Sequence, residues 1–168
     1  MIIRPEAPGD IAHIRDILCA AFAGDQEADL VDGLRRDGDL LLSMVADDAG
    51  RLVGHIGFSR VLIRKEGLRA PGVSLAPLSV VPDRWRSGVG AALVEAGHAQ
   101  LRTEGEAIVF VLGDPAYYGR FGYSIAAAAA FDCIYAGPHF QGLTLTSLTP
   151  KVGTISYAAA FDRLPSSD

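Results

Sequence analysis

One stretch, residues 78–93, constrains the fold of this chain more than any other. It begins with an apolar run that is typical of a buried strand. Pro82 ends that strand, because proline has no N–H to give to a ladder. A basic loop with Gly88 and Gly90 follows, and the apolar spacing beyond it is that of a helix. The stretch therefore predicts a strand, a glycine loop and a helix, in that order.

This arrangement is one that binds phosphate groups. Glycines let the backbone approach a ligand closely, and the unpaired N–H groups of a helix start attract anions. Arg84 and Arg86 add positive charge. A tight turn that binds nothing stays open as an alternative. The sequence lacks the Gly-Lys-Ser/Thr of a P-loop, and Leu93 stands where a dinucleotide fingerprint needs Gly or Ala. A two-glycine pyrophosphate loop remains.

Composition limits the remaining possibilities. The 168 residues suffice for one domain, 1–168. Hydrophobic residues make up 49% of the chain and charged residues 21%, a composition that is typical of a compact protein. The net charge of −5 disfavours a nucleic-acid binder, and no apolar run could span a bilayer. Cys19 and Cys133 make no metal or redox spacing, and the N-terminus lacks a signal-peptide pattern. We expect a cytoplasmic protein without a metal, a nucleic-acid partner or a membrane anchor.

Apolar periodicity and turn residues divide the rest of the chain. The pattern predicts helices between Asp10 and Gly24, over 26–36, over 88–103 with His98 facing water, and after Asp114-Pro115. It predicts strands over 1–4, 40–46, 52–64, 73–81, 108–112, 143–148 and 154–157. It leaves 126–130 unassigned and the tail 165–168 frayed. The crossover from 73–81 to 108–112 makes those strands parallel, with a ligand expected at their carboxyl ends.

Two segments resemble motifs of the GNAT superfamily of N-acetyltransferases. Residues 84–90 are similar to its acyl-CoA-binding motif, an Arg or Gln, two residues, Gly, any residue, and Gly or Ala. Residues 109–123, which contain Tyr-Tyr-Gly-Arg-Phe-Gly-Tyr, resemble its downstream strand–helix motif and are most similar to the YhbS-like branch. The resemblance covers nearly the whole chain. It implies a mixed α/β (α+β) fold: a mostly antiparallel sheet with one splayed parallel pair of strands, flanked by helices.

The resemblance also implies a donor site. Trp85 departs from the motif, since the family has Arg or Gln there, but the cradle is mostly backbone N–H, and Arg86 could supply the missing charge. Pro77 is consistent with a bulged fourth strand whose free edge binds the pantetheine arm. The expected acetyl-CoA contacts are Leu78, Ser79, Val80, Arg84, Trp85, Arg86, Ser87, Gly88, Val89, Gly90, Ala91, Gly113, Asp114, Tyr117 and Phe121.

Tyr118 matches the tyrosine of the family motif. The resemblance implies that it protonates the departing CoA thiolate, because a phenol of pKa ~10 is protonated at neutral pH. The alternative is that it only packs against the CoA sulfur. Tyr117 is interpreted as a packing residue. No carboxylate occurs between Ser74 and Val81, where many members carry the base, so the general base stays open.

No sequence motif marks the residues that would bind the acceptor. Asp25, Glu27 and His55 are candidate bases or acceptor contacts; the alternatives are helix capping and a solvated face for the two carboxylates, and an ordinary hydrogen-bonded histidine for His55. The acidic loop suggests a cationic amine on a small molecule or a protein. We expect transfer from acetyl-CoA to a primary amine by direct attack, and a homodimer is allowed for. The alternatives are a non-catalytic CoA-binding or ligand-sensing module and an acyltransferase for longer chains.

Overall fold

The computed structural model describes residues 1–165; residues 166–168, part of the tail predicted to fray, lie outside the described residues. The contacts divide the chain into two compact units. The first unit contains 1–59, 77–98 and the C-terminal segment from Ala158. The second contains 60–76 and 99–157. Strands β3 (Arg51–Lys65) and β4 (Leu68–Val80) each contribute to both units.

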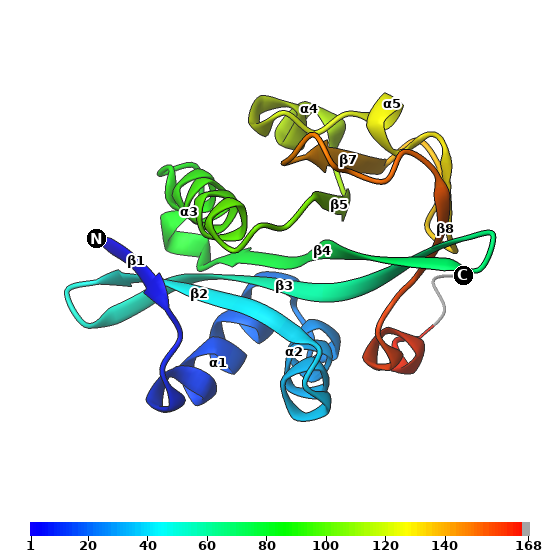
Figure 1. Ribbon diagram of the computed structural model, residues 1–168. Helices are drawn as coiled ribbons and strands as arrows, with labels where there is room; N and C mark the ends of the chain where they lie inside the picture. Colours follow the sequence, from blue (N-terminus) through cyan, green and yellow to red (C-terminus); the bar gives the residue numbers. More distant parts are fainter. Residues whose placement is uncertain (166–168) are drawn as a thin grey trace. The chain divides into compact units, whose positions relative to one another are not determined.

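The first unit is a sheet between two layers of helices. Strand β1 (Ile2–Pro5) pairs antiparallel with β2 (Leu40–Asp48), and β2 pairs antiparallel with β3. Helices α1 (Ile11–Phe22) and α2 (Gln26–Asp37) lie on one face, and α3 (Val89–Thr103) lies on the other (Figure 1). Because side chains alternate along a strand, Gly54, Ile56 and Phe58 of β3 face α3, and His55 and Gly57 between them face α1 and α2.

Close contacts on both faces support this alternation. A Cβ atom at Gly54 would lie 2.9 Å from the Leu93 side chain, and one at Gly97 would lie 2.5 Å from the Phe58 ring. On the other face, side chains from α1 and α2 form a buried cluster with Val45 of β2. The glycines therefore let α3 pack closely on the sheet, while larger apolar residues fill the opposite face.

The second unit is built around β5 (Ile108–Leu112). It pairs parallel with β4 from Val73 to Leu75 and antiparallel with β7 (Phe140–Thr144). Strand β8 (Gly153–Ser156) pairs antiparallel with β3 and parallel with β6 (Phe131–Asp132). The short helices α4 (Pro115–Tyr118) and α5 (Ile125–Ala128) follow β5. Stacked rings of Phe110 and Phe140 lie in its core.

The strand order is β1-β2-β3-β4-β5-β7, with β8 paired to β3 and β6. The predicted fold class is confirmed: a mixed, mostly antiparallel sheet that contains the parallel pair β4–β5 and carries flanking helices. Two-residue turns join β2 to β3 and β3 to β4, because Ala49-Gly50 and Glu66-Gly67 adopt the positive φ angles that such turns need.

Two local predictions need correction, and one unassigned patch proves to be helical. The strand predicted over 143–148 lies at Phe140–Thr144, because pairing with β5 sets its register. His98 is buried and does not face water, because the buried side of α3 is wide enough to take in Val94 as well. The unassigned patch at 126–130 overlaps helix α5, whose first turn is capped by the Ser124 hydroxyl accepting the Ala127 N–H.

Candidate active site

The glycine loop lies where the sequence placed it, between the end of β4 at Val80 and the start of α3 at Val89. Gly88 has a φ of +87°, a left-handed conformation that only glycine adopts without strain. Arg86 also has a positive φ, +59°, which is uncommon for a residue with a side chain. Strained backbone of this kind is concentrated at ligand-binding sites. The loop thus has both the predicted position and the backbone expected of a ligand cradle.

The two loop arginines are in different electrostatic situations. Arg84 forms an ion pair of 2.7 Å with Asp48 and so lowers the pKa of that carboxyl group. Arg86 is exposed and makes no ion pair with any residue in 1–165. The charge available to an anionic ligand therefore comes mainly from Arg86, the residue that the sequence suggested as a substitute at this position.

The remaining predicted donor contacts of the first unit follow the strand edge and the helix start. Leu78 and Val80 are half-buried, and Ser79 is buried with its hydroxyl 3.4 Å from the His55 carbonyl oxygen. Trp85 is exposed, and its indole N–H donates to the Val80 carbonyl. Ser87 is exposed, Val89 is buried, and Gly90 and Ala91 are half-buried.

The motif after β5 forms a short capped helix in the second unit. The Asp114 carboxylate accepts the Ala116 N–H at 2.9 Å, and Pro115 occupies the first helical position, as predicted. A Cβ atom at Gly113 would lie 2.5 Å from the Tyr118 ring. Gly113 is therefore required because the Tyr118 ring lies directly against its backbone.

Tyr118 lies within a cluster of aromatic rings. Its ring makes edge contacts with Tyr117 at 5.0 Å and with Tyr123 at 5.7 Å between centroids. Burial raises the pKa of the Tyr118 phenol well above its usual value. The phenol is thus neutral at physiological pH and has a proton to donate. Tyr117 packs against Phe121 and lies under the Arg120 guanidinium at 4.6 Å, which fits its predicted packing role.

The acidic loop precedes α2 in the first unit. Asp25 is at the N-cap position, but its side chain makes no capping hydrogen bond. Asp29 forms an ion pair of 2.7 Å with Arg15. Neither Asp25, which is exposed, nor Glu27, which is half-buried, forms an ion pair within the described residues. The Asp25 side chain therefore makes no capping hydrogen bond, and both a solvated charged helix start and a contact with a cationic ligand stay open for it.

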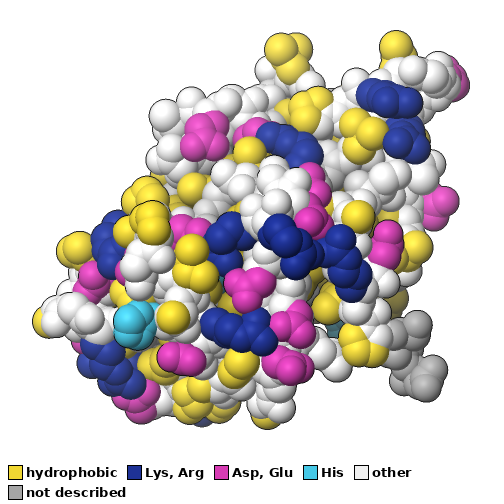
Figure 2. All heavy atoms as spheres, turned by 90° about the horizontal axis from the view of Figure 1, so that it is seen from below, with side chains coloured by type: hydrophobic (Ala, Val, Ile, Leu, Met, Phe, Trp, Pro, Cys, Tyr) yellow, Lys and Arg dark blue, Asp and Glu magenta, His cyan; other side chains and the backbone are white. Residues whose placement is uncertain are grey.

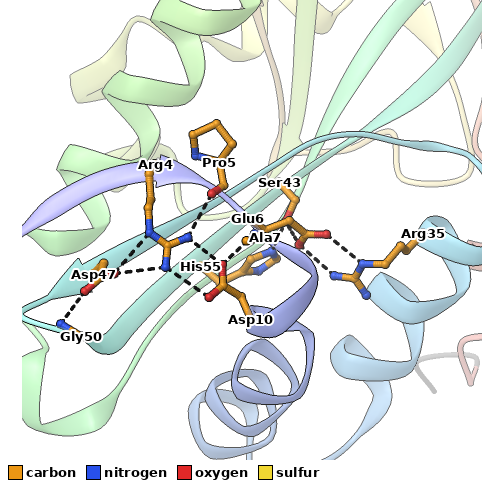
Figure 3. A network of polar contacts seen from close by, with 10 residues as sticks. All are labelled: Arg4, Pro5, Glu6, Ala7, Asp10, Arg35, Ser43, Asp47, Gly50 and His55. Atoms are coloured by element: carbon orange, nitrogen blue, oxygen red, sulfur yellow. Dashed lines mark hydrogen bonds and ion pairs between the residues drawn. The ribbon is translucent and has the colours of Figure 1, made fainter.

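His55 is a predicted site residue that has no access to solvent. Its side chain is fully buried, and burial lowers its pKa to about 4, so the imidazole is neutral at pH 7. Its Nε2 atom lies 2.8 Å from the Ser43 Oγ, and Ser43 in turn contacts Glu6 (Figure 3). Glu6 is held by two hydrogen bonds of 2.9 Å from Arg35.

This network determines the tautomer of His55. Burial alone would raise the pKa of Glu6, but hydrogen bonds from Arg35 and Ser43 lower it below its usual value. Glu6 is therefore ionised, and the Ser43 hydroxyl must donate to it. The Ser43 oxygen then accepts the Nε2–H of His55, which leaves Nδ1 unprotonated and without a hydrogen-bond partner among residues 1–165.

The network itself was missed at the level of sequence. Glu6, Arg35 and Ser43 lie far from His55 along the chain, and no spacing pattern links them. The only available signal was the sequence position of His55, which alternation places on the same face of β3 as Gly57 and Ser59. Sequence thus identified a polar position within the sheet but not the groups that hold it.

The predicted residues fall into two groups. Asp25, Glu27, His55 and the stretch 78–91 belong to the first unit, and Gly113, Asp114, Tyr117, Tyr118 and Phe121 belong to the second. Figure 2 shows the face formed by α1 and α2, where basic and acidic side chains are interspersed. Ion pairs such as that of Arg15 with Asp32, at 2.7 Å, join the two helices there.

The described residues contain neither a candidate metal site nor a candidate membrane-spanning helix. Within 1–165, no three His, Cys, Asp or Glu side chains lie close enough together to hold a metal ion. None of the helices over the same range has both the length and the apolar character needed to cross a membrane.

Comparison with known proteins gives matches over most of the chain. Residues 2–126 match the family model described as an acetyltransferase (GNAT) domain. An uncharacterized N-acetyltransferase of Escherichia coli, YhbS, is 39% identical over 168 residues, which cover 97% of this chain and 99% of that protein. A second E. coli protein, the uncharacterized N-acetyltransferase YjhQ, is 40% identical over 77% of this chain and 71% of its own.

Two solved structures are similar over nearly the whole chain. The crystal structure of E. coli YhbS in complex with CoA has a TM-score of 0.89 and 37% identity, and covers 98% of this chain and 93% of that one. A GNAT family acetyltransferase of Brucella melitensis, in complex with acetyl-CoA, has a TM-score of 0.81 and 38% identity, with 96% and 97% of the two chains covered.

Proposed function

The chain belongs to the GNAT family of acetyltransferases, and we propose on that premise that it transfers the acetyl group of acetyl-CoA to a primary amine by direct attack. The observation that carries the proposal is the likeness, over nearly the full length, to two acetyltransferases crystallised with CoA and acetyl-CoA. Acetyl-CoA is the donor. The family match runs through residues of both compact units, which supports treating 1–168 as one acetyltransferase domain.

The glycine loop is the proposed cradle for the pyrophosphate of the donor. The backbone N–H groups of residues 86–91 supply hydrogen-bond donors at the start of α3, where the helix dipole favours negative charge. Arg86 adds an unpaired cation to the same loop. Leu78 and, through its N–H, Val80 then offer backbone groups to the amides of the pantetheine arm, and a backbone N–H from 78–80 stabilises the oxyanion formed during transfer.

Tyr118 is the proposed general acid. The attacking amine must first lose a proton to a base or to water, because an ammonium has no lone pair. When the neutral amine nitrogen then attacks the thioester carbon, the carbon–sulfur bond breaks and the sulfur leaves as a thiolate. The Tyr118 phenol gives its proton to that sulfur, and the nitrogen loses its extra proton to a base or to water. Burial supports this role because it keeps the phenol protonated.

The acceptor is proposed to be a cationic amine, on a small molecule or a protein, that meets Asp25 and Glu27. Their carboxylates form no ion pair within the described residues, so their charge is available. His55 is the weaker candidate as a base, because its side chain is buried and its pKa is low. The free thiols of Cys19 and Cys133 support a cytoplasmic location, and a homodimer stays a prediction.

The first test is a calorimetric titration with acetyl-CoA, with free adenosine diphosphate as the comparison ligand. We expect micromolar binding of acetyl-CoA, followed by thiol release when a panel of primary amines is added. Binding without turnover on any amine would favour the alternative of a CoA-binding or ligand-sensing module. Faster turnover with longer acyl-CoA donors would instead favour the alternative of an acyltransferase for longer chains.

A matched pair of glycine variants tests the cradle. Gly88 and Gly50 have nearly equal φ angles, +87° and +88°, and a Cβ atom at either would meet nothing within 4 Å. Gly88→Leu and Gly50→Leu should therefore carry the same backbone strain, about 1–2 kcal/mol. We expect only Gly88→Leu to lose acetyl-CoA affinity, by at least about tenfold. Retained affinity in Gly88→Leu would remove the loop from the donor site.

A further inference from the structure

Trp85 is an unusual residue for an exposed loop. It is the only tryptophan of the chain, and 59% of its surface is exposed. It stands where the family motif has a polar side chain, so its ring is not explained by the pyrophosphate cradle. Exposed large aromatic rings of this kind occur at binding surfaces, where they supply a rigid apolar face.

The indole ring is anchored by its polar end. The Nε1–H donates to the Val80 carbonyl at 2.7 Å, and the backbone N–H of Trp85 donates to the Pro82 carbonyl at 3.3 Å. The neighbouring Arg86 takes the left-handed conformation described above. The backbone and the indole N–H of Trp85 are thus both held by hydrogen bonds.

The Val80 carbonyl belongs to a particular edge of β4. The Val81 N–H donates to Val53 of β3, and successive residues of a strand point their backbone groups to opposite sides. The carbonyl of Val80 therefore points away from β3, as do the backbone groups of Leu78 if the alternation continues. The parallel ladder of β4 ends at Leu75. The indole N–H thus binds the last carbonyl of β4 that points away from β3. This edge of β4 is the one that, in the proposed function, binds the amides of the pantetheine arm.

The chemistry of acetyl-CoA indicates what lies against the ring. Its pantoate segment, which carries two methyl groups on one carbon, links the pyrophosphate to the amides of the pantetheine arm. If the loop holds the pyrophosphate and the β4 edge holds the amides, the pantoate segment passes between them. Trp85 lies at that point, since it follows Val80 by five residues, precedes Gly88 by three and is bonded to Val80.

We propose that Trp85 recognises the pantoate segment of acyl-CoA: the exposed indole face packs on the paired methyl groups, and the indole N–H closes the end of the β4 edge. This inference rests on the proposed function. It makes Trp85 a binding residue for a part of the donor that adenosine diphosphate lacks, so the two ligands separate its role from that of the glycine loop.

Fluorescence gives a direct test, because the single tryptophan makes all selectively excited tryptophan emission a signal from this position. Titration of the wild-type protein with CoA should change the intensity or wavelength of that emission, and titration with adenosine diphosphate should change it much less. Equal changes with the two ligands, or none with CoA at a saturating concentration, would overturn the inference.

Variants give the second test, read by calorimetry. Trp85→Ala should lower the affinity for CoA about tenfold and leave the affinity for adenosine diphosphate unchanged, and Trp85→Phe, which keeps a ring without the N–H, should lose less. Leu148→Ala, at a side chain that is 91% exposed, is the control and should bind both ligands normally.

The two proposals fail in different ways. If Trp85→Ala weakens both ligands equally, or weakens neither, Trp85 does not recognise pantoate and this inference alone falls. If the folded wild-type protein binds neither ligand, the proposed function falls and the inference falls with it.

Discussion

The Tyr118 hydroxyl is the single group on which the proposed chemistry depends most. Tyr118→Phe removes it but keeps the ring that packs on Gly113 and the neighbouring tyrosines. We expect turnover to fall by about 10²–10⁴-fold, the usual contribution of a general acid. Acetyl-CoA affinity should stay within about threefold, because the ring contacts persist. Steady-state kinetics and calorimetry measure the two quantities.

Tyr117→Phe is the matched control for that variant. The adjacent residue loses the same atom, but its ring packs on Phe121 and under Arg120. We expect turnover close to that of the wild type. An equal loss in both variants would indicate a structural effect of the hydroxyls, and no loss in Tyr118→Phe would leave the thiolate to be protonated by another group or by water.

The pH dependence of turnover follows from the direction of the Tyr118 shift. Because burial raises the pKa of the phenol, its proton is retained through the alkaline range in which a free tyrosine begins to ionise, about pH 9–10. We expect kcat at saturating substrate to show no decline over about pH 8–10 from loss of this proton. A decline over this interval that Tyr118→Phe abolishes would contradict the expected direction of the shift.

At the level of elements, the contact between α3 and β3 depends on glycine. A Cβ atom at Gly97 would lie only 2.5 Å from the Phe58 ring, which is fully buried. Although alanine favours helix by up to ~1 kcal/mol, we expect Gly97→Ala to lower the free energy of unfolding by about 1–3 kcal/mol, because the helix and strand must separate. Denaturant unfolding measures this.

Glu95→Ala provides the comparison on the same helix. Glu95 is exposed, so its replacement should change the free energy of unfolding by no more than about 0.5 kcal/mol. If Gly97→Ala proves as stable as Glu95→Ala, the α3–β3 contact is loose enough to accommodate a methyl group, and close packing of the helix is not what requires glycine.

Elements with strong local signals were predictable. The continuous apolar run 108–112 coincides with β5, and Asp114-Pro115 begins α4 as expected, because capping and apolar runs act over a few residues. The strand β7 was placed too late because its limits depend on pairing with β5, a partner about 30 residues away. Local pattern does not contain that register.

The same distinction separates the parts of the candidate site. The glycine loop was predictable because its glycines, its basic residues and the helix start are contiguous. The ion pair of Arg84 with Asp48 was not, nor was the chain of contacts from His55 through Ser43 to Glu6, because the partners lie 12 to 37 residues apart along the sequence. Burial decides the charge of His55, and burial is a property of the packed unit.

Considered as a whole, the folded protein keeps a neutral histidine buried, and its stability must therefore depend on pH. In the unfolded chain a histidine titrates near its ordinary pKa of 6.5, whereas in the folded state the pKa of His55 is about 4. Between these values the unfolded state binds more protons than the folded state. The free energy of unfolding therefore rises with pH across this interval and falls as the solution is acidified.

The expected size of this effect is about 3 kcal/mol, since one pKa unit corresponds to ~1.4 kcal/mol. Glu6, whose pKa is lowered, adds a loss in the same direction only at more acid pH, as its own carboxylate is protonated. Denaturant unfolding of the wild type at intervals from about pH 7 to pH 4 should therefore show a loss of stability that begins near pH 6.5.

Replacing His55 tests whether this histidine causes the loss of stability at acid pH. His55→Gln should be less stable than the wild type at neutral pH, because the Ser43 oxygen loses the hydrogen bond from the His55 ring. Between about pH 6.5 and pH 4.5, however, this variant should lose much less stability than the wild type does. Ser59→Ala is the control: Ser59 is equally buried on the same strand and does not titrate, so the variant should keep the wild-type slope. If His55→Gln keeps the full slope as well, other groups titrate in this interval and His55 is not held neutral by burial.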